Sequence, residues 1–359
     1  MHGRWAIAWV AALAIVVAVG AGPPVIAMPA PECTGAEALS GTCLVRRYEV
    51  LTQTLGVQAA LADLAERRTT NSYLNLACHQ IAHVVGRTAS QRSGLAAFRE
   101  GSDDCASGYY HGVTEGVMEK IGPDRIATEA QAVCADFRQD RAFSYLHYNC
   151  IHGMGHGFMA VFETDVFRSL AGCDLLAETW EREHCYSGVF MENLTSMEDP
   201  KRPSKDLRPQ QPLYPCTAVE SRYKGECYVK QTAYALYVHN GDFGAVFRLC
   251  QDESDIEFRA VCHQGIGGDA AIASSKYVIG KEAQVATTRQ LCLLGPDALA
   301  REHCIAGAVI TTVRDLAGDD TKARALCGAL DDERLATVCQ ATLQATSEGV
   351  PATIGTHQH

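Results

Sequence analysis

The stretch CLLGPDALAREHCIAGAVITTV, residues 292–313, carries two cysteines twelve positions apart, on either side of a Gly-Pro pair. Gly295 and Pro296 predict the end of one helix and the start of the next, because proline fits the first turn of a helix. In one straight helix, cysteines twelve positions apart would be separated by about 18 Å, which is too far for a disulfide. On the two arms of a hairpin they can meet. The stretch therefore predicts a helical hairpin closed by a disulfide between Cys292 and Cys304.

The same arrangement recurs along the chain from residue 134 onward. Cysteines come in pairs, and the first cysteine of one pair lies 34 to 43 positions before the first cysteine of the next. A helical repeat of this length is typical of stacked helical hairpins. The predicted disulfides are Cys134–Cys150, Cys173–Cys185, Cys216–Cys227, Cys250–Cys262, Cys292–Cys304 and Cys327–Cys339.

Each predicted hairpin has the same internal order. The first cysteine ends one helix, an acidic turn follows, and the second cysteine lies about two turns into the next helix. Acidic residues suit this turn because they stabilise a helix N-terminus. A glycine follows the second cysteine in the pattern C-x-x-G, where the missing side chain would let a neighbouring helix come close. The pattern occurs at residues 105–108, 150–153, 185–188, 262–265 and 304–307.

The composition is that of a globular protein with an unusual number of cysteines. The chain has 359 residues, of which 47% are hydrophobic and 20% charged, and its net charge is −11. Because no run of lysine or arginine stands out, nucleic acid is not an expected partner. An even count of 16 cysteines indicates a disulfide framework or metal clusters.

The N-terminus favours disulfides over metal clusters. Arg4 precedes an apolar run that ends at Gly20, and small residues follow up to Ala27. This run is shorter than the roughly 20 residues that a membrane span needs. We interpret residues 1–27 as a cleaved export signal, with an uncleaved membrane anchor as the lesser alternative. Export predicts a secreted or periplasmic protein in an oxidising compartment, with no membrane span after the signal.

The sequence predicts an all-α fold, a disulfide-stapled array of helical hairpins that resembles an α-solenoid and has a His-rich N-terminal module. The Pro-rich stretch that divides the array is expected to be a surface loop or linker. The predicted parts are a signal peptide at 1–27, the His-rich module at 28–194, the Pro-rich linker at 195–215, further hairpins at 216–345 and a flexible tail at 346–359.

Four cysteines fall outside the hairpin pattern, namely Cys33, Cys43, Cys78 and Cys105. Their positions favour disulfides from Cys33 to Cys43 and from Cys78 to Cys105. A disulfide between Cys43 and Cys78 stays open as an alternative, because connectivity does not follow from sequence alone.

Two of the predicted helices carry histidine at the same place. Residues 105–113 read CASGYYHGV and residues 150–158 read CIHGMGHGF, so both contain the pattern C-x-x-G-x-x-H-G. His111 and His156 are therefore equivalent. The later hairpins hold Met191, Gly268 and Ile310 at this position. The histidines thus change along the array, which a purely structural repeat does not require.

Three predicted helices each carry a pair of potential metal ligands four positions apart. This spacing places both side chains on one face of a helix. The pairs are His79 with His83, His111 with Glu115, and His152 with His156. Adjacent packed hairpins can bring three such faces together.

We interpret these pairs as a transition-metal site with one or two ions. Imidazole is a suitable ligand for Cu, Fe and Zn, and helical bundles build such centres from facing helices. The predicted ligands are His79, His83, His111, His152 and His156. Glu115 is predicted to be a sixth ligand or a catalytic general base.

Two other roles for these histidines stay open beside a metal site. They could be core residues with hydrogen-bond partners, or could act without a metal. The segment HQIAH at 79–83 differs from the H-E-x-x-H motif of zinc proteases, because Gln80 replaces the catalytic glutamate. No C-x-x-C-H motif predicts covalent haem, although a non-covalent haem held by two histidines stays an alternative.

Three functions follow from these patterns. The first is an exported metalloprotein that serves as a metal-dependent oxidoreductase of the Cu or Fe type. The second is a solenoid scaffold whose concave face binds a protein or peptide, with a basic partner favoured by the net charge of −11. The third is metal storage or delivery without turnover.

The array of exported, disulfide-closed helical hairpins is similar in general plan to the cysteine-rich Sel1-like repeat proteins. The usual Sel1 residue pattern is absent and the cysteine spacing differs. The resemblance therefore implies a fold of stacked hairpins and no functional residue.

Overall fold

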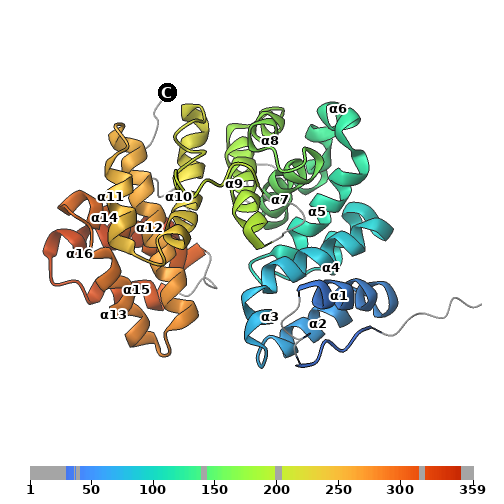
Figure 1. The fold of residues 1–359 in the computed structure, drawn as a ribbon, viewed down its shortest axis with the longest axis horizontal. Coiled ribbons are helices and arrows are strands. Elements are labelled where there is room, and N and C mark those ends of the chain that lie inside the picture. Colours follow the sequence, from blue (N-terminus) through green and yellow to red (C-terminus); the bar gives the residue numbers. More distant parts are fainter. Residues whose placement is uncertain are drawn as a thin grey trace, which may run out of the picture.

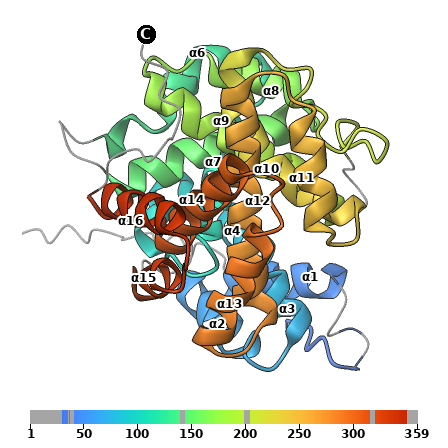
Figure 2. The same ribbon diagram turned by 90° about the vertical axis from the view of Figure 1, so that its left-hand side faces the viewer.

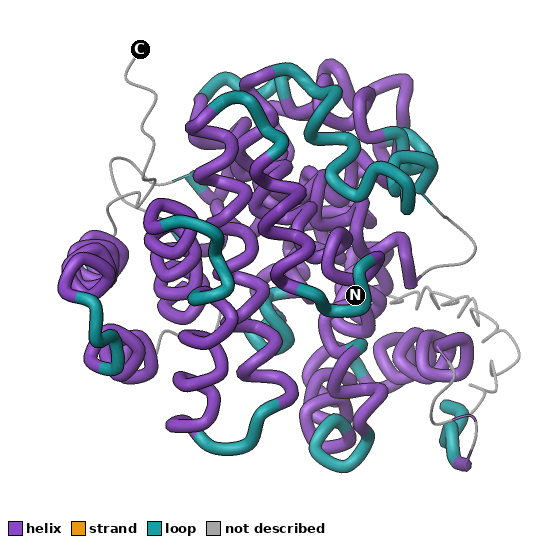
Figure 3. Tube along the Cα trace, turned by 60° about the vertical axis from the view of Figure 1, so that its left-hand side comes forward, coloured by secondary structure: helices purple, strands orange, loops and turns teal. Residues whose placement is uncertain are grey.

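The computed structural model describes residues 30–35, 37, 41–138, 144–198, 204–314 and 320–348. The predicted signal peptide, and the predicted tail from residue 349 onward, lie outside the described residues. All regular secondary structure within the described residues is helical (Figure 3). The predicted all-α class is therefore confirmed.

The described chain forms sixteen α-helices. The first nine are α1 (Gly41–Leu55), α2 (Val57–Arg67), α3 (Ser72–Leu76), α4 (Cys78–Ser93), α5 (Gly108–Ile121), α6 (Pro123–Val133), α7 (Tyr145–Val161), α8 (Val166–Cys173) and α9 (Thr179–Thr195). The other seven are α10 (Ser221–Val238), α11 (Phe243–Gln251), α12 (Ile256–Tyr277), α13 (Lys281–Cys292), α14 (Ala298–Arg314), α15 (Asp320–Gly328) and α16 (Glu333–Ser347). Short 3-10 helices follow α4, α6 and α9.

Eight of the helices form a row in which each packs against the next. This central row runs α4, α5, α7, α9, α10, α12, α14 and α16. The flanking helices α6, α8, α11, α13 and α15 each pack on the central helix that follows them in the chain or on its neighbours. Figure 1 shows α1 to α9 on one side and α10 to α16 on the other, joined where α9 and α10 lie side by side. Figure 2 shows α10, α12 and α14 of the second group facing the viewer.

All six predicted hairpin disulfides are present. The second cysteine is the seventh residue of its helix in α9, α10, α12, α14 and α16, as expected for a position two turns in. In most hairpins the first cysteine lies at or near the end of the flanking helix, whereas Cys216 lies in a turn. The disulfide-stapled array of hairpins is thus confirmed.

The remaining cysteines pair as Cys33–Cys43 and Cys78–Cys105. The alternative link from Cys43 to Cys78 is therefore wrong. Cys105 also departs from the hairpin pattern, because it precedes its helix instead of lying two turns inside it. Cys105, Ala106 and Ser107 have φ values of 55°, 52° and 62°, and α5 begins only at Gly108. Three successive left-handed residues replace the first turns of a helix here.

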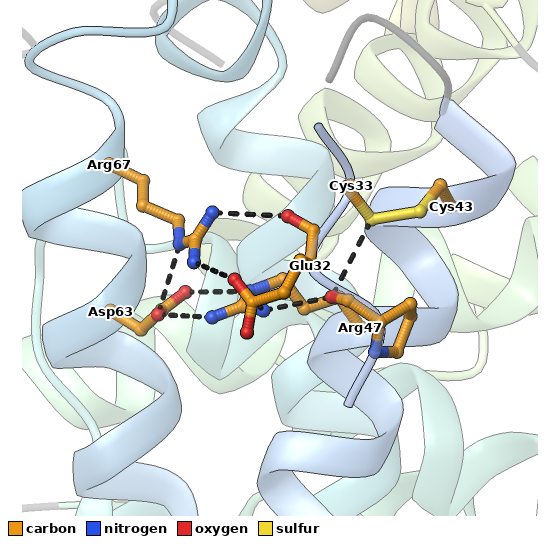
Figure 4. The surroundings of a disulfide bond; sticks show 7 residues. Glu32, Cys33, Cys43, Arg47, Asp63 and Arg67 are labelled. Carbon is orange, nitrogen blue, oxygen red and sulfur yellow. Dashed lines mark hydrogen bonds and ion pairs between the residues drawn. A yellow bond between two sulfur atoms is a disulfide. The ribbon is translucent and has the colours of Figure 1, made fainter. Parts of the chain in front are cut away.

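The N-terminal segment is held on the hairpin of α1 and α2 (Figure 4). The Cys33–Cys43 disulfide links this segment to α1. Beside the disulfide, the Arg47 guanidinium donates a hydrogen bond to the carbonyl oxygen of Pro31 at 2.8 Å. Arg47 also makes a two-pronged ion pair with Asp63 of α2, at 3.1 and 2.6 Å. Such forked pairs fix geometry as well as charge. The segment before α1 is therefore part of the packed structure.

Part of the predicted Pro-rich linker is packed against the array. Residues 199–203 lie outside the described part, and 204–215 contain no helix. Asp206 and Leu213 are buried, and the Gln231 amide of α10 donates to the carbonyl oxygens of Pro212 and Tyr214. The end of the linker is thus fixed to the helix that follows it.

The eight disulfides indicate a protein that folds in an oxidising compartment. Across the part of the chain that the structure describes, no helix combines the length and the apolar character needed to cross a bilayer.

Close contacts between central helices occur at the predicted C-x-x-G glycines. A Cβ atom on Gly307 of α14 would overlap the backbone oxygen of Gln264 in α12. A Cβ atom on Gly188 of α9 would overlap the backbone oxygen of His152 in α7. The glycine one turn after the second cysteine therefore lets neighbouring backbones touch, as the sequence predicts.

Gly307→Ala is expected to destabilise the protein by several degrees in the melting temperature, because neither backbone can move away without disturbing a hairpin disulfide. Gly225→Ala is the matched control, since Gly225 lies inside α10 and a Cβ atom there would meet nothing within 4 Å. The control should be stabilised by about 1 kcal/mol through helix propensity alone. Thermal unfolding of both variants tests the prediction, and equal melting temperatures would contradict it.

Candidate metal centre

Three neighbouring central helices bring the predicted histidines together. α4 supplies His79 and His83, α5 supplies His111, and α7 supplies His152 and His156. α4 packs on α5, and α5 packs on α7. The predicted convergence of three ligand-bearing helix faces is therefore observed.

Glycines allow these backbones to approach. A Cβ atom on Gly112 of α5 would overlap the backbone oxygen of His83 in α4. On α7, added Cβ atoms at Gly153 and Gly157 would press on Thr114 and Met118 of α5, respectively. Because histidine is a short side chain, imidazoles on three helices meet only when the helices lie this close.

Four of the histidine rings form a compact group. His79, His83, His111 and His156 each offer a ring nitrogen, and these four atoms lie within 4.8 Å of one another. Taken around the group in the order 79, 83, 156, 111, neighbouring ring centres are 4.7, 4.9, 5.1 and 5.3 Å apart. The two diagonals are 6.3 Å and 5.6 Å. This four-histidine cluster could hold one metal ion.

The outer nitrogens of three rings are fixed by acceptors. Nδ1 of His79 lies 2.9 Å from the carbonyl oxygen of Cys105. Nδ1 of His83 lies 3.2 Å from a carboxylate oxygen of Glu115, and Nδ1 of His156 lies 2.9 Å from Glu192. Each acceptor requires a proton on Nδ1, so the Nε2 lone pair of the neutral ring is left to face inward. Metal-binding histidines typically have this arrangement.

The inward nitrogens lack ordinary partners. Nε2 of His79 and Nε2 of His83 face each other at 3.1 Å, and Nε2 of His156 is buried without a hydrogen-bond partner. Two lone pairs at hydrogen-bond distance repel unless a proton or another cation lies between them. Burial, followed by the charges of neighbouring histidines, lowers the pKa of His79 to about 4 and the pKa of His83 well below its ordinary value. A proton is therefore a poor occupant at neutral pH.

Nδ1 of His111 has no hydrogen-bond partner, although Asn149 of α7 lies close to it. Asn149 of α7 lies close enough to influence the pKa of His111, yet Nδ1 of His111 and Oδ1 of Asn149 are both buried without a geometrically sound hydrogen bond. The Asn149 amide nitrogen is used, because it donates to the Tyr145 carbonyl oxygen at 2.9 Å. The Asn149 oxygen is thus a buried acceptor without a hydrogen-bond partner close to His111.

His152 lies next to the four-histidine cluster and is not one of its four members. Its ring centre is 4.7 Å from His111 and 5.2 Å from His156. Its side chain is 2% exposed, and neither ring nitrogen has a hydrogen-bond partner. The structure thus brings together four of the five predicted histidine ligands around one point and places the fifth against two of them.

Glu115 lies on the outer side of His83, away from the inward nitrogens. Both of its oxygens also accept from the Arg87 guanidinium, at 2.8 and 2.9 Å. Its fully buried carboxylate is thereby balanced by a cation. In return, Glu115 raises the pKa of Arg87 above its ordinary value.

Glu192 of α9 is the second carboxylate that faces the cluster. Burial tends to raise its pKa, but the hydrogen bond from His156 opposes this effect, and the pKa lies below its ordinary value. The Thr195 hydroxyl also donates to Glu192 at 2.9 Å. Glu192 therefore keeps an ionised acceptor on the outer side of His156.

Sequence reasoning did not identify Glu192, Arg87, Asn149 or the Cys105 carbonyl. Arg87 lies four positions after His83, on the face of α4 that also carries His79 and His83, so helical spacing could have identified it. Glu192 directly follows Met191, the residue compared with His156 across the hairpins. The role of the Cys105 carbonyl depends on a left-handed turn that the helical interpretation of residues 105–113 did not include.

No protein-family model, curated protein or solved structure matches this chain significantly. The case for a function therefore depends on the chemistry of the four-histidine cluster itself.

The metal-free protein is expected to lose stability as the pH falls from 7 to 5. Unfolded histidines take up protons near pH 6.5, whereas His79, His184 and His263 have pKa values of about 4 in the folded state because burial opposes their charge. The unfolded state then binds more protons, so the free energy of unfolding falls with pH. Burial acts in the opposite direction on carboxyl groups, since it raises the pKa of Asp269 to about 7 and also raises the pKa of Glu226 and of Asp206, but more histidines than carboxyl groups are shifted in this way.

Denaturant unfolding at both pH values, with a chelator present, measures this loss. The variant His263→Phe should lose about 2 kcal/mol less than the parent between pH 7 and 5, since one fully buried histidine is removed. Equal stability of the parent at the two pH values would show that these histidines do not stay neutral in the folded protein.

Proposed function

We propose that this protein is an exported metalloprotein that holds one transition-metal ion between α4, α5 and α7. His79, His83, His111 and His156 are the proposed ligands. The observation that carries the proposal is their convergence, with four ring nitrogens inside 4.8 Å and three outer nitrogens fixed by acceptors. A cation at this point would satisfy the facing Nε2 atoms of His79 and His83, which otherwise repel each other.

Copper is the ion that we propose for this ligand set. Imidazole binds Cu, Zn, Fe and Ni, and Cu²⁺ binds most tightly among the divalent ions of this series. Equal distances between all four rings would indicate a tetrahedron, whereas in a square the diagonals exceed the sides by about 1.4-fold. The ring centres lie between these limits, with sides of 4.7 to 5.3 Å and diagonals of 5.6 and 6.3 Å. A flattened tetrahedron suits copper better than zinc.

The surrounding residues would hold the ligands in place. The Cys105 carbonyl and the carboxylates of Glu115 and Glu192 would keep three rings in the tautomer that presents Nε2 inward. We also propose that a small rotation of His111 joins its Nδ1 to the Asn149 oxygen when the ion is bound. In this arrangement Glu115 is a positioning residue, because Arg87 and His83 occupy its oxygens.

Among the functions that fit such a centre, an oxidoreductase is favoured over storage or delivery of metal. Delivery needs ligands that exchange readily with a partner, whereas His83, His111 and His156 are at most 4% exposed. His79 alone among the four is partly exposed, and we propose that a small substrate reaches the centre from its side. Four neutral ligands on a redox-active ion, buried but accessible from one side, support redox chemistry on a small substrate.

The exported protein, purified from an oxidising periplasm, is expected to contain one equivalent of metal by elemental analysis. The variant His111→Ala/His156→Ala removes two of four ligands and should retain less than a tenth of it. The matched control is His263→Ala/His303→Ala, which removes two histidines from the second half of the array and should keep the full equivalent. A parent without metal, or a cluster variant with the parent's metal content, would contradict the proposal. Two equivalents would indicate a dinuclear centre instead.

Glu192→Ala is expected to weaken metal binding by about 10- to 100-fold while leaving the four ligands in place, since outer partners of ligand histidines have effects of this size. Glu253→Ala is the control, because Glu253 is a similarly hydrogen-bonded carboxylate held by Lys224 and Tyr228 far along the chain. Competition with a chelator of known affinity measures both variants. If both lose affinity equally, the effect reflects stability, and Glu192 has no particular role at the centre.

A further inference from the structure

Among the buried histidines that the structure describes, His152 stands out because neither of its ring nitrogens has a hydrogen-bond partner. The ring is 2% exposed. A neutral imidazole carries one N–H and one lone pair. Leaving both unpaired costs about 1–3 kcal/mol for each group.

The two unpaired nitrogens of His152 lie next to the four-histidine cluster. Its ring centre lies 4.7 Å from His111 and 5.2 Å from His156, and it follows the same face of α7 as His156. The ring of Tyr148 stacks on it at 6.0 Å. A donor on His152 thus lies next to the His111–His156 edge of the cluster, beside the proposed ion.

The charges around the cluster favour an anion as that partner. Four neutral imidazoles leave the charge of a divalent ion uncompensated among its direct ligands. Glu115 is balanced by Arg87, which leaves the single carboxylate of Glu192 near the ligands. The centre with its ion would thus keep a net positive charge in a buried place.

We propose, on the basis of the metal site proposed above, that His152 donates a hydrogen bond to a small anion bound at an open coordination position of the ion. A flattened arrangement of four ligands leaves room for a further ligand beside their plane. Three of the four ligand rings and His152 are nearly fully buried, so the proposed anion is a small one, of the size of hydroxide or azide. His152 is thus a binding residue for the exogenous ligand and not a fifth ligand of the metal.

The test is an azide titration of copper-loaded protein, followed through the azide-to-copper absorption band. His152→Phe should keep one equivalent of copper and an unchanged electron paramagnetic resonance spectrum without azide. Its dissociation constant for azide should rise by at least about tenfold, because a hydrogen bond to an anion is stronger than one between neutral groups. His152→Gln restores an N–H donor and should recover part of the affinity.

His263→Phe provides the matched control. His263 is also 2% exposed with an unpartnered ring nitrogen, but it lies on α12. This variant should bind azide like the parent, which separates the local effect from general loss of stability. An unchanged azide constant in His152→Phe overturns the inference, and loss of copper in that variant overturns it in favour of a direct ligand. A parent that takes up no copper instead overturns the proposed metal site and this inference with it.

Discussion

The disulfide between each flanking helix and the second turn of the next central helix is the constraint on which this fold depends. It fixes the two arms of a hairpin, and in α7, α9, α12 and α14 a glycine three positions later faces the preceding central helix. In α14 these residues are Cys304 and Gly307, and in α9 they are Cys185 and Gly188. One helical turn therefore carries both the covalent link within a hairpin and the contact between hairpins. The separation of central helices is set by backbone contact, which leaves little freedom in how they stack.

The four-histidine cluster depends on the same short separation. Imidazoles from α4, α5 and α7 reach one point because Gly112 and Gly153 let these backbones touch. The Cys78–Cys105 disulfide adds to this, since its residues flank His79 on one side and supply the carbonyl acceptor for its Nδ1 on the other. Fold and site thus share their determinants, and the rigidity that closes the hairpins also holds the ring nitrogens in place.

The sequence predicted the hairpins well because a disulfide has a strict distance limit and each pair is local. The sequence did not decide the disulfide partner of Cys43, because the N-terminal segment contains no repeat with which its cysteines could be compared. For the site, helical spacing identified His79, His83, His111 and His156 but not how their rings are held. Glu192 comes from α9, which carries none of the four histidines, and Asn149 of α7 lies near His111 of α5, so both take part only through tertiary packing. The Cys105 carbonyl depends on a left-handed turn that no propensity of Cys105-Ala106-Ser107 favours.

The second half of the array shows that close packing does not by itself require a histidine at the register of His156. α12 and α14 touch through Gly267 and Gly307 as closely as α4 and α5 touch through Gly112, and they are joined to their hairpins by equivalent disulfides. At this register the two helices hold Gly268 and Ile310, which bring no polar side chain into the contact. A well-packed interface is thus available to the chain without an imidazole at this position. Burying four neutral imidazoles with their nitrogens facing one another costs free energy that the apolar version avoids. Binding of a cation at the point where those nitrogens meet, as proposed above, would compensate for this cost.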